Sequence, residues 1–301
     1  MTHTISHVLL AQLSDLIATQ LGLHFPRTRW SELERAIHAA AREFDVPDPE
    51  ACMQWLLSAP LTQQQVAILA SHLTIGETYF FREPHVFAML EEVILPALMR
   101  ARRERARRLR VWSAGCATGE EPYSIAISIS KVIPKGQDWR VTLLATDINP
   151  RFQQVASEGT YREWSFRDTA PWIKARYFSR QPGGRLVIRS AIRKMVTFTY
   201  LNLADDVYPS LLTNTTAMDV IFCRNVLMYL APEQAKKVVH KLYRALADGG
   251  WLIVGPCETS QALFASFQTV NIPGAILYRK HGSCESPAPG GRPHQRERAA
   301  I

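Results

Sequence analysis

The sequence predicts an α/β protein with a mostly parallel sheet, preceded by a region made only of helices. The first 83 residues carry apolar side chains at helical spacing, without a glycine turn or an alternating strand. From residue 109 onward, short apolar runs alternate with helical segments, as in a sheet that helices cover on both faces. The first such run leads into a turn with Gly115 and Gly119, which is where sheets of this kind bind nucleotides.

The helical region is predicted from the spacing of its apolar residues. Its expected helices cover residues 9–17, 30–44, 50–58 and 61–73, and a further helix over 84–107 leads into the sheet. The second helix carries Arg35, His38 and Arg42 on the face opposite its apolar side. We therefore expect a small helical domain over residues 1–83.

The remaining ordered chain, 84–281, is predicted to form the sheet domain. Expected strands cover 109–113, 141–146, 195–201, 218–223 and 250–254, with helices over 122–133, 151–158 and 232–247. A final pair, 267–270 and 275–279, is expected to add an edge hairpin. The alternation of strands and helices is interrupted at 159–194. There, a turn at 182–184 and an alternating run at 185–189 predict a small inserted β-subdomain. The tail, 282–301, is rich in Pro, Gly, Ser and charge, which favours disorder.

Composition limits the class of protein. Of 301 residues, 47% are hydrophobic and 21% charged, as in ordinary globular proteins, and no apolar run reaches membrane-spanning length. We expect a cytoplasmic protein that is not inserted in a membrane. The five cysteines show no Cys-x-x-Cys pair and no zinc-like histidine spacing, so we expect free thiols, several of them buried in strands, and no structural metal.

The net charge of +8 favours acidic partners, and seven arginines lie between Arg100 and Arg110. Such a run suits nucleic acid or an acidic protein surface, but more often it is simply the solvated end of a helix. It lacks the interleaved aromatic residues that single-stranded nucleic acid would need.

The glycine turn is followed by Glu120 and Glu121 rather than by Lys-Ser/Thr. Two carboxylates would repel a phosphate, whereas they suit a cationic ligand such as the sulfonium and ammonium of S-adenosyl-L-methionine (AdoMet). A second interpretation is open, because Thr118 and Glu121 stand at the spacing of a helix capping box.

Polar residues follow the next strands at the same expected edge. Asp147 ends the second strand, where a carboxylate accepts hydrogen bonds from ribose hydroxyls, or else it caps the following helix. Asn202 and Leu203 follow the third strand, at the position that borders a bound adenine. Asn202 alone would also suit a turn at the end of a strand.

The strand over 219–223 delivers Arg224, Asn225 and then Tyr229 to this edge. Burying such groups is costly unless they find partners, so they point to a site. Upstream, Thr78 and Arg82 stand at i and i+4, which would put them on one face of a helix.

Four segments occur in order: Thr-Tyr-Phe-Phe-Arg-Glu (78–83), Gly-Cys-Ala-Thr-Gly-Glu-Glu-Pro-Tyr-Ser (115–124), Ala-Thr-Asp-Ile-Asn (145–149) and Phe-Cys-Arg-Asn-Val-Leu-Met-Tyr (222–229). Together they resemble the CheR family, the chemotaxis receptor glutamate methyltransferases. The resemblance implies a Rossmann-like AdoMet-dependent methyltransferase sheet and AdoMet as cofactor. It implies AdoMet contacts from these residues: Thr78, Arg82, Glu121, Asp147, Asn202, Leu203, Arg224 and Asn225. It also places Arg82 and Tyr229 near the transferred methyl group, as the catalytic residues.

The same resemblance implies a partner, the cytoplasmic signalling domain of a methyl-accepting chemoreceptor. Its glutamates would be methyl-esterified during receptor adaptation by a monomeric enzyme that binds no nucleic acid. The helical domain would face the receptor, and the inserted β-subdomain would be a docking surface.

Two departures from the family pattern stand out. Gly76 replaces an asparagine that these enzymes commonly carry, so no side-chain AdoMet contact is expected there. The turn over 179–185 is short compared with members that hold a receptor's C-terminal peptide.

Two other functions remain open on the sequence alone. One is a nucleic-acid methyltransferase, although Cys223-Arg-Asn-Val stands where base methylation often uses Asp/Asn-Pro-Pro-Tyr. The other is a non-catalytic AdoMet-binding scaffold.

Overall fold

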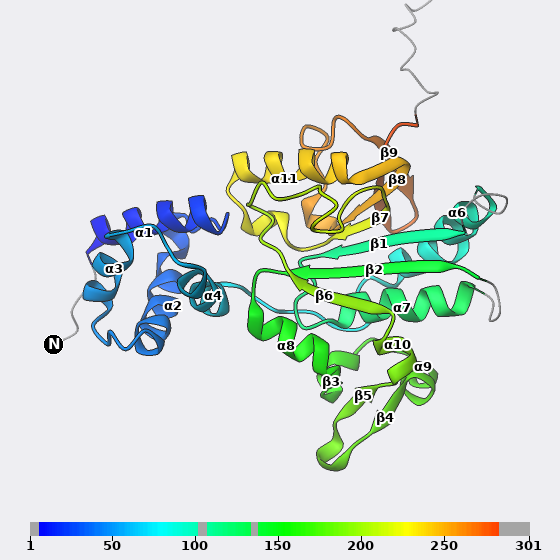
Figure 1. Cartoon of the computed structure of the whole chain (residues 1–301), viewed down its shortest axis with the longest axis horizontal. Coiled ribbons are helices and arrows are strands. Elements are labelled where there is room, and N and C mark those ends of the chain that lie inside the picture. The colour runs from blue at the N-terminus through cyan, green and yellow to red at the C-terminus, as the bar shows by residue number, and fades with distance from the viewer. Residues whose placement is uncertain (1–5, 102–106, 134–137, 283–301) are drawn as a thin grey trace, which may run out of the picture.

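The computed structural model describes residues 6–101, 107–133 and 138–282. The predicted tail, the end of the helix expected over 84–107 and the middle of the arginine run lie outside the described residues. Figure 1 shows the N-terminal helices grouped beside the edge of the sheet at which β1 and β2 end.

The N-terminal helices share one hydrophobic core, as the spacing of apolar residues predicts. They are α1 (His7–Gln20), α2 (Trp30–Glu43), α3 (Pro49–Leu57) and α4 (Gln63–Leu73), and all four contribute buried side chains. The start of α3 is capped by Asp48, whose carboxylate accepts a hydrogen bond from the Ala51 N–H at 3.1 Å. Thr62 and Gln65 form a capping box at the start of α4. The four expected helices are confirmed.

The segment after α4, residues 74–83, is not helical, so the prediction that Thr78 and Arg82 share a helical face is wrong. Two neighbouring phenylalanines explain the difference. Phe80 is buried against the ring of Phe166 at a centroid distance of 4.7 Å, and its N–H donates to the Ser165 carbonyl at 2.9 Å. Phe81 has a φ of 57°. These tertiary contacts and the left-handed backbone exclude a regular helix.

The helix expected over 84–107 is interrupted. The described part consists of α5 (Pro84–Met89), a π-helical turn (Leu90–Ile94) and α6 (Leu95–Ala101). Pro96 has no N–H to donate within the helix, and its ring clashes with the preceding turn of a regular helix. The wider π turn relieves that clash.

The main sheet has seven strands in the order β6-β2-β1-β7-β8-β10-β9. The strands are β1 (Arg108–Ala114), β2 (Arg140–Asp147), β6 (Val196–Tyr200), β7 (Met218–Cys223), β8 (Leu246–Val254), β9 (Gln268–Ile272) and β10 (Ala275–Arg279). The first five in this order pair in parallel, and β10 is antiparallel to both its neighbours. The parallel sheet and its C-terminal hairpin are confirmed.

Helices cover both faces of this sheet, which explains its near-continuous apolar strands. They are α7 (Glu120–Val132) and α8 (Pro150–Glu158) after β1 and β2, and α11 (Pro232–Ala245) after β7. Val111 and Phe222 pack on the face that α7 covers, whereas Trp112 and Ile221 pack on the face of α11. The predicted helix over 232–247 ends two residues early because β8 already begins at Leu246.

The inserted β-subdomain is a three-stranded antiparallel sheet in the order β3-β5-β4. Its elements are β3 (Thr160–Tyr161), α9 (Pro171–Tyr177), β4 (Phe178–Arg180), β5 (Leu186–Ile188) and α10 (Ser190–Arg193). The predicted hairpin corresponds to β4 and β5. Leu186 and Ile188 are buried against the main core, so this strand is not simply exposed.

Four cysteines lie in the described residues and all are free thiols. Of these four, only Cys223 lies in a strand, since Cys52 is in α3, Cys116 is in the glycine turn and Cys257 is in a 3-10 turn (Pro256–Glu258). The expectation that several lie in strands is therefore wrong. Of the helices that the structure describes, none is long and apolar enough to cross a membrane.

Candidate functional site

A cleft lies between the carboxyl edge of the parallel strands and the N-terminal helices. Its lining includes every residue that the sequence singled out for the site: Thr78, Arg82, Glu121, Asp147, Asn202, Leu203, Arg224, Asn225 and Tyr229. These residues are distant in the chain. The parallel sheet brings them together because each follows a strand, or a segment packed on one, at the same edge.

The glycine turn after β1 keeps this edge open. Gly115 has a φ of 84°, and a Cβ atom there would lie 2.4 Å from Cγ2 of Val226. The N–H groups of Gly115 and Cys116 both donate to the Thr146 carbonyl, at 2.8 and 2.9 Å. Only glycine fits the backbone conformation and the close approach of the loop after β7.

Glu121 is a carboxylate of the cleft, with a side chain that is 12% exposed, and not a capping residue. The residue before α7 is Gly119, which makes no side-chain cap, and the Thr118 hydroxyl donates to Glu120 instead at 2.6 Å. The capping-box interpretation is therefore wrong. Glu121 accepts hydrogen bonds from the Ser113 hydroxyl at 2.7 Å and from Arg224 at 3.0 Å. Burial raises the pKa of Glu121, and the nearby Arg224 charge opposes that rise.

Asp147 lies buried at the end of β2. One carboxylate oxygen accepts the Ala117 N–H at 2.8 Å and the other accepts the Asn149 N–H at 2.9 Å. The cap of α8 is Asn149, whose side chain accepts the Arg151 N–H at 2.9 Å, so Asp147 does not cap this helix. Burial raises the pKa of Asp147. Each oxygen keeps a lone pair, which leaves the carboxylate able to accept ribose hydroxyls.

Asn202 and Leu203 line the cleft in different ways. The Asn202 amide donates to the Gln20 carbonyl and to the Asp205 carboxylate, both at 2.8 Å, and its oxygen accepts the Ala204 N–H at 3.0 Å. Asn202 is therefore a turn residue that also ties the sheet to the end of α1. Leu203 is buried and offers an apolar wall.

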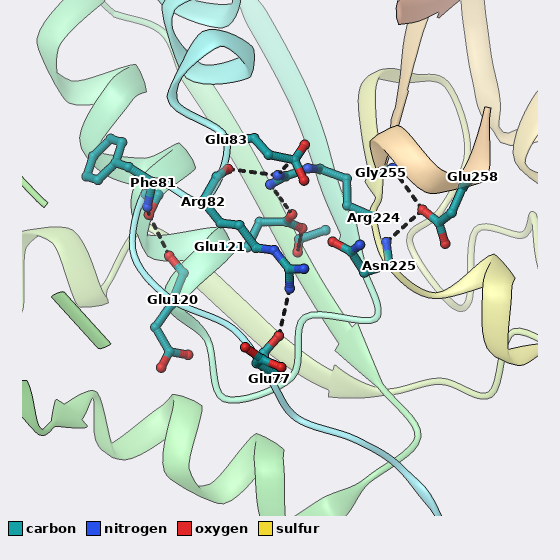
Figure 2. A network of polar contacts seen from close by, with 12 residues as sticks. Glu77, Phe81, Arg82, Glu83, Glu120, Glu121, Arg224, Asn225, Gly255 and Glu258 are labelled. Carbon is teal, nitrogen blue, oxygen red and sulfur yellow. Dashed lines mark hydrogen bonds and ion pairs between the residues drawn. The ribbon is translucent and has the colours of Figure 1, made fainter. Parts of the chain in front are cut away.

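Arg224 joins three segments of the site (Figure 2). Its guanidinium donates to Glu121, to the Arg82 carbonyl at 2.7 Å, and lies 2.9 Å from the Glu83 carboxylate. The Arg224 side chain is only 2% exposed, and its Nε has no partner among the described residues. A buried donor without a partner is costly, so Nε marks a place for a further acceptor.

The segment 74–83 forms one wall of the cleft. The carbonyl of Arg82 faces Arg224, while its guanidinium turns toward Glu77 and donates to the Glu77 carbonyl at 2.9 Å (Figure 2). Thr78 is half-buried in the same wall. Gly76 lies against Phe152, where a Cβ would approach Cζ of that ring to 2.5 Å. The ring of Phe152 therefore fills the space beside Gly76.

Tyr229 stands on the wall formed with the helical region, which the sequence did not reveal. The His24 N–H donates to the Tyr229 carbonyl at 2.7 Å, and the Arg29 guanidinium lies 5.9 Å from the centre of the Tyr229 ring. His24, Phe25 and Arg29 all line the cleft. No sequence pattern linked these residues to a site, because their role depends on how the helices pack on the sheet.

Glu258 is a second residue that the sequence did not reveal. Its carboxylate accepts the N–H groups of Asn225 and Val226 at 2.7 Å and of Gly255 at 2.8 Å (Figure 2). It holds the loop in which Asn225 adopts a left-handed φ of 57°. The available signal was its position just after β8, at the edge where the other polar residues gather.

The residues present fit AdoMet. The carboxylates of Glu121 and Asp147, which are 12% exposed and buried respectively, suit a cationic ligand with a ribose, and the unpartnered Nε of Arg224 fits an additional acceptor. Among the described residues, no three His, Cys, Asp or Glu side chains gather as metal ligands would.

Comparisons with known proteins agree with this fit. Residues 76–276 match the family model described as CheR methyltransferase, SAM binding domain. The chain is 35% identical over 211 residues to chemotaxis protein methyltransferase 1 of Pseudomonas aeruginosa, covering 69% of this chain and 74% of that protein. It is 32% identical over 197 residues to the chemotaxis protein methyltransferase of Borreliella burgdorferi, covering 65% and 68%.

A further relative matches nearly the whole chain. An uncharacterized 104.1 kDa protein of Rhodobacter capsulatus is 28% identical over 293 residues, which is 97% of this chain but 29% of that protein. Among solved structures, the crystal structure of DszA carbon methyltransferase aligns at a TM-score of 0.44 with 14% identity, covering 92% of this chain and 70% of the other. The family match spans most of the chain, including every residue of the site from Thr78 to Tyr229. The chain therefore belongs to the CheR family of AdoMet-dependent methyltransferases.

Proposed function

We propose that this protein transfers the methyl group of AdoMet to glutamate γ-carboxylates of a chemoreceptor's cytoplasmic signalling domain, forming methyl esters during adaptation. One observation carries the proposal. The cleft combines Arg82 on one wall and Tyr229 on the other with the carboxylates of Glu121, which is 12% exposed, and of Asp147, which is buried. The names of the relatives, which are chemotaxis protein methyltransferases, support the same reading.

In this proposal, most of the cleft holds the cofactor. Asp147 accepts the ribose hydroxyls, Leu203 packs on the adenine, and Asn202 lies at its edge. Glu121 and Asn225 border the charged amino-acid end, and Thr78 lies on the opposite wall. Arg224 opposes the rise that burial causes in the pKa of Glu121, and it joins Glu121 to the wall that contains Arg82.

AdoMet, when bound, supplies a methyl group carried on a cationic sulfur. A glutamate carboxylate is already ionised and nucleophilic near neutral pH, so the chain needs no general base. Its task is to align the carboxylate and remove water from it, which is catalysis by proximity and orientation. Arg82 orients a carboxylate at the site, and Tyr229 bounds the path of the methyl group.

We propose that the helical domain binds the receptor and that the methyltransferase domain carries out the transfer, as the sequence predicts. The helical domain, residues 1–83, faces the receptor, with Arg35 and Arg42 attracting its acidic helices. The methyltransferase domain, residues 84–281, carries the chemistry, and its insertion at 159–194 is a docking surface. The short turn over 179–185 favours direct engagement of the substrate over tethering to a receptor's C-terminal peptide.

Labelled AdoMet offered together with receptor-containing membranes and with nucleic acid tests this function. We expect alkali-labile label, diagnostic of methyl esters, on receptor protein only. Alkali-stable label in nucleic acid would instead establish the nucleic-acid methyltransferase. AdoMet binding without transfer to any receptor would establish a scaffold. The variant Arg82→Ala removes the guanidinium but keeps the rest of the cleft wall, and it should no longer transfer the methyl group to the receptor.

A further inference from the structure

The edge of the sheet opposite the cleft carries a cluster of arginines. Arg108 begins β1 and lies in register with Arg140, which begins β2, and the Arg140 N–H donates to the Arg107 carbonyl at 2.8 Å. Arg107, Arg108 and Arg140 are exposed. Arg110 follows on the same strand, and burial together with the nearby charge of Arg108 lowers the pKa of Arg110. The proposed methyl transfer makes no use of this cluster.

The loop between β6 and β7 reaches the same edge. The Arg110 guanidinium donates to the Thr216 carbonyl at 3.1 Å and to the Asn214 carbonyl at 2.8 Å. The arginine cluster and this loop are therefore neighbours, joined through Arg110.

The loop presents two leucines to solvent. Leu211 is 86% exposed and Leu212 is 99% exposed. Hydrogen bonds hold the loop in this shape, since the Ser210 N–H donates to the Thr215 hydroxyl and the Thr215 N–H donates to the Ser210 carbonyl, both at 3.2 Å. A loop ordered in advance loses little conformational entropy when its tip is buried by a partner.

We propose that this edge is a peripheral binding surface for an anionic phospholipid membrane. Leu211 and Leu212 enter the boundary between headgroups and acyl chains, and Arg107, Arg108 and Arg140 bind lipid phosphates. Apolar tips flanked by cationic residues are the usual means by which a protein lies on an anionic bilayer. Guanidinium groups suit phosphate because they can donate two parallel hydrogen bonds.

The size of the tip favours a membrane over a protein partner. A stable protein interface buries about 800 Å² per partner around packed anchors, and a two-leucine tip is far smaller. Insertion between lipid headgroups requires neither so large a contact area nor a complementary surface of fixed shape. The orientation is also suitable, because strands β1 and β2 run from this edge toward the cleft (Figure 1), so membrane contact leaves the cleft open. The inference does not depend on the identity of the methylated substrate.

Co-sedimentation of the full chain with vesicles tests the surface. We expect binding to vesicles of about 30% phosphatidylglycerol in phosphatidylcholine, little binding to pure phosphatidylcholine, and weakening as salt rises toward about 0.15 M. Leu211→Asn with Leu212→Asn should weaken binding by a factor of about 30 or more. Arg107→Gln with Arg140→Gln should weaken it about five-fold for each charge removed.

Matched controls come from the inserted β-subdomain, away from the arginine cluster and the loop between β6 and β7. Trp164 is 70% exposed and lies in the insertion, so Trp164→Asn removes an exposed apolar side chain elsewhere. Arg185→Gln removes an exposed charge from the turn of the insertion. Both should bind vesicles as the unaltered protein does, and all variants should keep the affinity for S-adenosylhomocysteine. The proposal is overturned if the unaltered protein stays in the supernatant with anionic vesicles, or if the double leucine variant binds undiminished.

Discussion

The guanidinium of Arg224, at the end of β7, lies 3.0 Å from the carboxylate of Glu121 in the first turn of α7, although 103 positions separate the two residues. The side chains are 2% and 12% exposed. Glu83 lies on the other side of the same guanidinium, at 2.9 Å. A single cation therefore connects the end of β7 with the first turn of α7 and with the segment 74–83 that forms one wall of the cleft.

Removing this cation should destabilise the protein strongly. Arg224→Met leaves the buried carboxylate of Glu121 without its counter-charge, and we expect a loss of about 3 to 5 kcal/mol in the free energy of unfolding. The double variant with Glu121→Gln should recover part of the loss, because only the more exposed carboxylate of Glu83 then lacks its counter-charge. Urea unfolding of the single and double variants measures the coupling. Strictly additive losses would mean that the ion pair contributes nothing.

Asp147→Asn should weaken the binding of S-adenosylhomocysteine by a factor of about 10 to 100, since a charged acceptor for ribose is lost. Calorimetry measures the effect directly. Asp15→Asn, at an exposed position on α1, makes the same chemical change away from the cleft and should leave the affinity unchanged. Equal affinities for all three proteins would remove Asp147 from the proposed ribose site.

As the pH is lowered, the affinity for AdoMet should begin to fall at a higher pH than it would if the carboxyl groups of the site were exposed to solvent. Burial raises the pKa of Asp147 and of Glu121 above the usual value of about 4, so both take up a proton at higher pH than an exposed carboxyl. Affinity for AdoMet, measured from pH 8 downward, should therefore begin to fall above that value. Asp147→Asn should flatten part of the decline. A flat profile down to pH 4 would contradict it.

The same raised pKa values affect the stability of the unliganded protein in the opposite direction: lowering the pH weakens ligand binding but stabilises the fold. A carboxyl whose pKa is raised by folding favours the folded state when neutral, so its contribution is fully present at low pH and is lost as pH rises through the folded pKa. Ionised Asp147 and Glu121 thus cost stability near neutral pH in the unliganded protein. Saturating S-adenosylhomocysteine should raise the melting temperature more at pH 8 than at pH 5.

Gly115→Ala should destabilise the protein through both backbone and packing. Its φ is 84°, and the new Cβ would lie 2.4 Å from Val226. Gly184, with a φ of 73° and nothing within 4 Å, offers a matched control that carries the backbone strain alone. We expect Gly184→Ala to cost about 1 kcal/mol and Gly115→Ala clearly more. Similar losses in urea unfolding would show that the contact with Val226 is easily relieved.

Glu258→Gln should loosen the loop that carries Asn225 and Tyr229. Glutamine keeps one acceptor oxygen but offers an amide N–H₂ where the carboxylate accepted a backbone N–H, and each buried donor left unsatisfied costs about 1 to 3 kcal/mol. Hydrogen exchange should show faster exchange at the amides of Asn225 and Val226, together with weaker S-adenosylhomocysteine binding. Glu233→Gln, in the exposed first turn of α11, is the control. Unchanged protection at both amides would contradict the role of Glu258.

The sequence alone predicted the architecture and much of the site, because both follow from local patterns. Apolar periodicity marked each strand of the main sheet, and polar residues directly after apolar strands marked its carboxyl edge. Asp147 and Arg224 could be placed in this way, since parallel strands bring their carboxyl ends together whatever their separation in the chain.

Only the tertiary structure decided the contacts that depend on packing between distant segments. Helical spacing predicted a helix at Thr78 and Arg82, but the burial of Phe80 and its backbone bond to Ser165 outweigh that local preference. Capping-box spacing allowed Glu121 to bond its own helix, but Arg224 and Ser113 take its carboxylate instead. Arg29 gave no local signal of a site, and Glu258 gave only its position just after β8. Local spacing describes which bonds a residue is able to make, whereas burial against remote partners decides which of them it makes.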